Sequence, residues 1–130
     1  LANKAVVKKF LIRICSSRKC KEFALLIIEH QKLITETINM DPERLLDFLE
    51  STDAIRRGDR FQELLMTYKV IFLFSKNKLD YAKIDNFLNK VLTSLKNTSI
   101  DNHKIKKLSD DQIKKKIREI RLNAIKSVSL

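Results

Sequence analysis

The chain has very few of the residues that interrupt helices or build tight turns. Its 130 residues include one glycine, one proline and no tryptophan. An all-β sandwich needs a turn signal about every 8–12 residues, so this scarcity excludes such a fold. Leucine, isoleucine and lysine are frequent instead, and they favour helices. A chain of this length can bury roughly two-thirds of its surface in one folded unit.

Long hydrophobic runs are also missing. The longest, "FALLII" and "VIFLF", have six and five residues, far fewer than the roughly 20 that cross a bilayer. Basic residues interrupt the apolar pattern of the first 17 positions, which excludes the uninterrupted core of a secretory signal peptide. We therefore expect no membrane partner and a cytoplasmic location. Because the chain opens on Leu1 rather than Met, we also expect it to begin inside a longer protein.

Residues that carry catalysis or bind metals are sparse. Two cysteines, Cys15 and Cys20, are too few for a disulfide framework, and no histidine stands at a zinc-ligand spacing from them. We expect Cys20 to be packed within a helix. We expect His30 to be a buried or half-buried helix residue rather than a base. With no glycine-rich phosphate loop and no His-Asp doublet, the sequence predicts no catalytic residue, metal site or cofactor site in this chain.

Acidic residues are too few to balance the basic ones, and the formal net charge is +11. Residues 66–130 carry 15 basic and 6 acidic side chains, whereas residues 1–65 carry 12 and 10. No acidic residue precedes Glu22, although seven basic residues do. A basic excess at both ends suggests a polyanionic partner. A solvated lysine-rich surface that only keeps the protein soluble is the alternative.

What the sequence does contain is helical periodicity. Apolar residues recur every three or four positions, and Asp41-Pro42 and the capping box Ser109–Gln112 mark two helix starts. We predict an all-α fold of about six helices in one irregular bundle that spans residues 1–130. The helices are expected from Ala2 to Ile14, Lys19 to Ile38, Pro42 to the charged segment at Asp53, Asp59 to Ser75, Tyr81 to Leu95, and Ser109 towards Ile125.

Two of these helices carry a further expectation about burial. The fourth contains "VIFLF", which is apolar all round, and is expected to be the central and most buried helix. The last is expected to face inward with four residues and outward with its basic ones. The inward residues are Ile113, Ile117, Ile120 and Ala124.

Two basic segments are candidates for RNA binding. The first lies between the third and fourth helices, where three arginines occupy five positions, and the second leads into and covers the last helix. No aromatic residue lies beyond Phe87, so the second segment has no rings for base stacking, and we expect it to grip a phosphate backbone. The candidates are Arg56, Arg57, Arg60, Lys106, Lys107, Lys114, Lys115, Arg118 and Arg121.

Three stretches together resemble a known family. They are "CKEFALLIIEHQKLI", "DPERLLDFLESTDAIRRGDRFQELL" and, more loosely, "QIKKKIREIRLNAI". They are similar to the C-terminal helical region of bacterial tRNA nucleotidyltransferases, the CCA-adding enzymes. That family carries an Asp-Ala-aromatic-Arg-Arg-Pro-Glu-Arg-Phe segment between leucine-rich helices. Here Asp53, Ala54, Arg56, Arg57, Arg60 and Phe61 match it, with Ile55 at the aromatic position and Gly58 in place of the proline.

The resemblance implies a division of labour. In the family the active site lies in an N-terminal head, followed by a nucleotide-selecting neck, and neither has a counterpart in this sequence. The parent protein would add C, C and A to tRNA 3′ ends from CTP and ATP with a divalent metal such as Mg²⁺. This chain would be the body and tail, which bind tRNA and position its 3′ end for the head.

The corner between the third and fourth helices has a specific expectation. Asp53 is expected to tie the corner together by an ion pair with one arginine. At least one of the other arginines is expected to stay free for tRNA.

Two alternatives remain open. The related bacterial poly(A) polymerases share the head and neck, although the extra-long basic tails expected there are not seen. A helical protein-interaction or dimerisation module, whose basic faces are incidental, is the alternative from another class of function.

Overall fold

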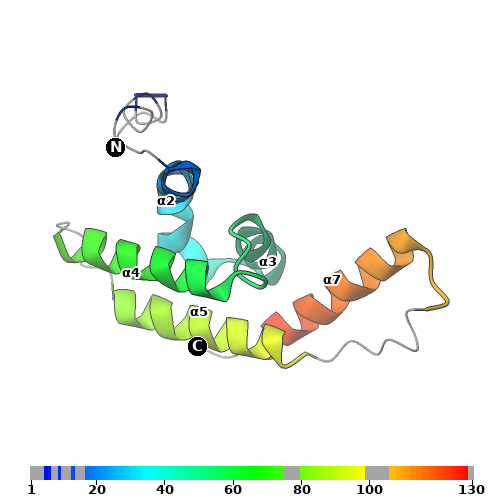
Figure 1. Ribbon diagram of the computed structural model, residues 1–130. Coiled ribbons are helices and arrows are strands. Elements are labelled where there is room, and N and C mark those ends of the chain that lie inside the picture. The colour runs from blue at the N-terminus through cyan, green and yellow to red at the C-terminus, as the bar shows by residue number, and fades with distance from the viewer. Residues whose placement is uncertain are drawn as a thin grey trace.

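The computed structural model describes residues 17–74, 80–98 and 106–128, together with Ala5, Val6, Lys9 and Arg13. This part of the chain is all helical apart from its connections, which confirms the predicted all-α class (Figure 1). Its elements are α2 (Arg18–Glu36), the short 3₁₀ helix η1 (Thr37–Asn39), α3 (Pro42–Ser51), α4 (Gly58–Phe74), α5 (Tyr81–Lys96) and α7 (Asp110–Lys126).

The bounds lie within about two residues of the predicted ones. The expected helix Ala2–Ile14 falls mostly outside the described residues, and the four that are described there have helical conformation.

Side-chain caps explain where most of these helices begin. The hydroxyl of Ser17 accepts from the amide of Cys20, and the carboxylate of Asp41 accepts from the amide of Arg44, with Pro42 in the first helical position. Ser109 and Gln112 form the predicted reciprocal capping box at the start of α7. Each cap satisfies backbone amides that have no partner inside the helix.

The helices pack around one core, with α4 and α5 antiparallel and side by side (Figure 1). α2 crosses α4, and α7 contacts both α3 and α5. The core takes residues from α2, α3, α4, α5 and α7. Its largest fully buried apolar side chains are Tyr68, Phe61, Ile34, Leu45, Leu46, Leu49, Leu64, Leu65, Ile84, Leu88 and Val91. Removal of this apolar surface from water is the main stabilising term of the fold.

Buried hydroxyls add specific ties between helices. The Tyr68 hydroxyl donates to the backbone carbonyl of Ile27, and the Tyr81 hydroxyl donates to that of Leu65. Burial raises the pKa of both phenols far above the usual value, so both remain protonated donors. Ser94 donates to the carbonyl of Ala124 at 3.0 Å and so joins α5 to α7.

The expectation that α4, the helix that contains "VIFLF", is the most buried one is wrong, because five of its 17 residues are buried whereas four of the ten residues of α3 are. Phe72 is buried, but Leu73 is 73% exposed and Phe74 is 88% exposed. Together with Met66 and Val70 they leave an apolar face on α4 open to solvent. α2 still contacts α4 at Tyr68, and Tyr81 contacts it at Phe72, whereas the last two residues of α4 are exposed.

The burial of single residues was predicted with mixed success. His30 is buried, and its ring meets Phe48 edge to face at 5.7 Å between centroids. Cys20, expected to be packed, is exposed on α2. On α7 the four expected inward residues are only half-buried, and Ile125 is the buried one. The first half of α7 projects away from the other helices (Figure 1), and the core contact is made by its C-terminal half.

Candidate nucleic-acid interface

The segment between α3 and α4 is built by a Schellman motif. The amide of Asp53 donates to the carbonyl of Glu50 at 3.0 Å, and the amide of Ala54 donates to that of Leu49 at 2.9 Å. Asp53 has the left-handed backbone conformation that this motif requires, with φ of 56°. Ala54 is fully buried beside the core. Asp53 and Ala54 therefore end α3 and turn the chain at a defined angle.

The arginine that follows is held by this turn. Arg56 Nη2 lies 2.8 Å from the carboxylate of Asp53, and Nε donates to the same oxygen at 3.2 Å. The hydrogen bond from Arg56 lowers the pKa of the Asp53 carboxyl, with smaller contributions from the charges of nearby arginines. Arg56 is nevertheless 81% exposed, so this surface pair adds little to stability.

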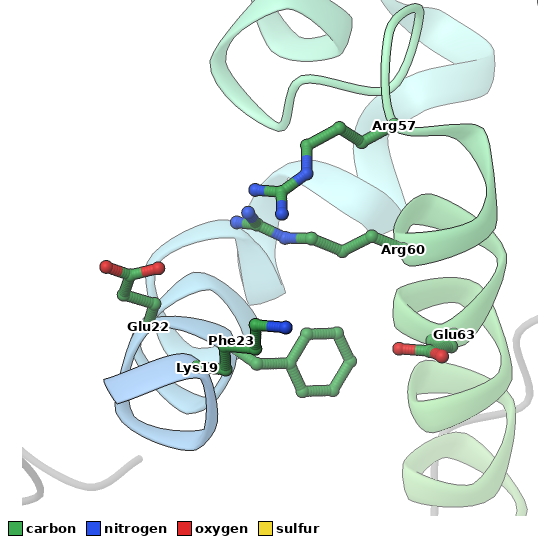
Figure 2. Close-up of a pocket in the computed structure, with 6 residues that line it drawn as sticks. All are labelled: Lys19, Glu22, Phe23, Arg57, Arg60 and Glu63. Atoms are coloured by element: carbon green, nitrogen blue, oxygen red, sulfur yellow. The ribbon is translucent and has the colours of Figure 1, made fainter. Parts of the chain in front are cut away.

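Arg57 and Arg60 differ from Arg56 because they have no carboxylate partner within salt-bridge distance in the described part of the chain. Arg57 is exposed and Arg60 is partly buried. Both side chains extend from the start of α4 towards α2, and their guanidinium groups lie close together (Figure 2). They line a hollow of about 200 Å³ between the two helices. The three arginines thus divide into one that is tied to the turn and two that remain available.

The candidate basic residues on α7 and just before it also divide into two groups. Lys106, Lys107, Lys114 and Lys115 are exposed at the end that projects from the bundle.

Arg118 and Arg121 instead face α3. Arg118 lies 2.9 Å from a carboxylate oxygen of Asp47 and 3.7 Å from one of Glu50, and Arg121 lies 2.8 Å from Glu50. The pKa of Arg118 is raised, first by its hydrogen bond to Asp47. In this structure these two arginines dock α7 onto α3.

One further basic residue lies at the arginine corner, and it was not among the candidates predicted from the sequence. Lys96, at the C-terminal end of α5, places its Nζ 3.2 Å from the position that a Cβ on Gly58 would occupy. With the three arginines it lines a second, open hollow of about 550 Å³. Helix periodicity does not show this proximity, since it depends on how α4 and α5 pack against each other.

Within the described residues there is neither a metal-binding cluster nor a membrane-spanning helix. No three His, Cys, Asp or Glu side chains gather there closely enough to hold a metal ion. No helix in the described ranges has the combined length and apolar character that crossing a bilayer requires. Comparison of the chain with family models, with curated proteins and with solved structures gives no match.

Proposed function

We propose that this chain is the tRNA-binding C-terminal part of a CCA-adding tRNA nucleotidyltransferase. The observation that carries the proposal is the Asp-Ala-x-Arg-Arg corner. There the turn residues are buried or held in place, and Arg57 and Arg60 extend towards α2 without carboxylate partners in the described chain. A rigid corner with unpaired guanidinium groups suits a phosphate backbone, which arginine binds through paired hydrogen bonds.

The exposed lysines at the start of α7 give this function a second contact region. Lys114 and Lys115 lie in the first half of α7, which extends from the bundle, and Lys106 and Lys107 precede this helix by a few residues. Lysines of this kind bind phosphates without reading sequence. In this proposal, the corner and the projecting end of α7 hold the folded tRNA. The divalent metal, CTP and ATP belong to a head domain, joined through a neck, that precedes this chain in the parent enzyme.

The direct test is tRNA binding by this chain at increasing salt concentration. If about six phosphates are neutralised, affinity should fall by roughly 10³-fold between 50 and 200 mM salt. The charge reversals Arg56→Glu and Arg57→Glu should weaken binding while helicity and melting temperature persist. The matched control is Lys83→Glu, a charge reversal at an exposed position near the N-terminal end of α5. It should have little effect on tRNA binding.

Three outcomes would contradict the proposal. They are no tRNA binding at low salt, an equal loss in the Lys83 control, and unfolding on charge reversal at the corner. A single-stranded oligoadenylate of similar length should bind more weakly than tRNA. Tighter binding of the oligoadenylate would favour the poly(A) polymerase alternative.

An interaction or dimerisation module is the second candidate, because one observation favours it. The face of α4 formed by Met66, Val70, Leu73 and Phe74 is exposed and apolar, as surfaces that contact other proteins often are. A concentration-dependent molar mass that returns to the monomer value in Leu73→Lys would support this function. The same variant should leave tRNA affinity unchanged if the two surfaces act independently.

A further inference from the structure

Two like charges converge on the hollow between α2 and α4. The guanidinium groups of Arg57 and Arg60 lie next to each other and point towards α2, beside Lys19 and Phe23 (Figure 2). Two cations held this close repel each other, more strongly where protein excludes water. An anionic group bound beside both side chains would offset this repulsion.

The carboxylates around the hollow do not supply that compensation. Glu22 is paired with Arg18 at 2.8 Å, and within the described chain its carboxylate makes no salt bridge with either guanidinium group. Glu63 also lines the hollow, yet it makes no salt bridge with either arginine within the described chain. The charge of the arginine pair is therefore open to a ligand.

One nitrogen atom of the arginine pair also lacks a hydrogen-bond partner. Arg60 Nε is buried and has no hydrogen-bond partner. A buried charged donor without a partner is costly, and native structures rarely leave one unless a ligand or another group supplies the bond. Arg60 Nε is thus a donor without an acceptor among the described residues.

The cationic surface continues on the other side of the arginine pair. The second hollow is lined by the same two arginines, by Arg56, by Gly58 and by Lys96 of α5. Asp59 also lines it, so the lining is not purely basic. Because the two hollows share Arg57 and Arg60, an extended polyanion can pass from one to the other with consecutive charged groups near basic side chains.

We propose that Arg57 and Arg60 clamp one phosphodiester of bound RNA between α2 and α4, and that Lys96 binds a neighbouring phosphate in the adjoining hollow. This inference rests on the proposed function. It assigns the specific contact to Arg57 and Arg60 rather than to the whole basic surface. Arg56 lies outside the clamp because Asp53 holds its guanidinium group. The two guanidinium groups offer several donors to the non-bridging oxygens of one phosphate, a match that single ammonium groups do not provide.

The test compares tRNA affinity of the full 130-residue chain and five single variants. Arg57→Gln and Arg60→Gln should each lower affinity about tenfold or more, whereas Arg56→Gln should lower it less than about threefold, because Asp53 already holds that guanidinium group. The matched control is Lys83→Gln, at an exposed position of α5 that lines neither hollow, and it should leave affinity close to that of the wild type. The slope of log affinity against log salt should flatten by about one for either clamp variant and again for Lys96→Gln. Circular dichroism checks that each variant keeps its helices.

A charge-conserving variant separates the clamp from general attraction. Arg57→Lys/Arg60→Lys keeps the net charge but loses the planar forks, and its affinity for tRNA should still fall about tenfold. Retained affinity in this variant would overturn the clamp.

Nuclear magnetic resonance reads the site itself. The amide of Gly58, the single glycine, and the Nε–H signals of Arg57 and Arg60 should shift when tRNA is added. Polyglutamate at equal charge should shift them far less, and equal shifts would show a site that does not select phosphate.

The outcomes distinguish this inference from the proposed function. If the wild-type chain binds tRNA but all three arginine variants lose affinity equally, the clamp is wrong while the tRNA-binding function stands. If the wild-type chain binds no tRNA at low salt, the proposed function fails, and the clamp for RNA fails with it.

Discussion

Asp53 combines a backbone role and a side-chain role at the arginine corner. Its left-handed conformation allows the Schellman motif that ends α3, and its carboxylate binds Arg56. Residues other than glycine pay a steric penalty for this conformation, and asparagine and aspartate pay less than most. The Asp-Ala-x-Arg-Arg segment is therefore partly structural, because Asp53 and Ala54 shape the turn from which the arginines extend.

Asp53→Ala should lower the free energy of unfolding by about 1–2 kcal/mol, because alanine keeps the steric penalty of the left-handed conformation. Asp53→Gly should cost about 1 kcal/mol less than that, since glycine adopts the conformation freely. Both variants lose the pair with Arg56, so the difference between them isolates the backbone term. Urea unfolding measures it, and equal stabilities of the two variants would show that strain at this position is unimportant.

At the scale of elements, the first residue of α4 is a position where a substitution should stabilise the protein. Gly58 is the first residue of this helix and its φ is not positive, so the position does not need the freedom of glycine. A Cβ there would meet the end of the flexible Lys96 side chain at 3.2 Å, which can move aside. Glycine at this position thus loosens the corner without any steric requirement for it.

Gly58→Ala should raise the free energy of unfolding by about 0.4–1 kcal/mol, because alanine restricts the unfolded chain and favours the helix. Ala82→Gly, the reverse change at an exposed position in the first turn of α5, should lower it by roughly 0.5–1 kcal/mol. Thermal unfolding followed by circular dichroism measures both changes. A less stable Gly58→Ala protein would mean that the position of Lys96 beside Gly58 contributes to the fold.

At the scale of the whole molecule, charged pairs help to fix how α7 lies on the bundle. α7 has one fully buried side chain among its described residues, Ile125. Glu50 of α3 contacts Arg118 and Arg121 of α7. Since α7 projects at its other end, the angle set by these pairs determines where its exposed lysines stand relative to the arginine corner (Figure 1).

Glu50→Gln should loosen this docking by about 0.5–1 kcal/mol, as expected for a partly exposed network of charges. Amide hydrogen exchange in α7 should become several-fold faster, and the difference from wild type should shrink in high salt. The matched control is Glu119→Gln, which removes the same charge from a pair with Lys116 within α7. Equal acceleration in the control would show that local helix stability, rather than docking, is responsible.

The sequence by itself determined the helical class, most helix bounds and the helix caps. These follow from local periodicity and from side chains that bind backbone amides within three residues, so no distant part of the chain is needed. The motif also predicted correctly that Asp53 pairs with an arginine, because Arg56 is only three residues away.

Only the tertiary structure decided which residues each helix hides and which it leaves open. The exposed end of "VIFLF", the docking of Arg118 and Arg121 on α3 and the approach of Lys96 to Gly58 all depend on how helices far apart in sequence meet. An apolar or basic stripe shows that a helix has a face, but whether another helix covers that face depends on packing across the whole bundle. The hollow beside Arg57 and Arg60 likewise depends on the tertiary structure, because it forms only where α2 packs across α4.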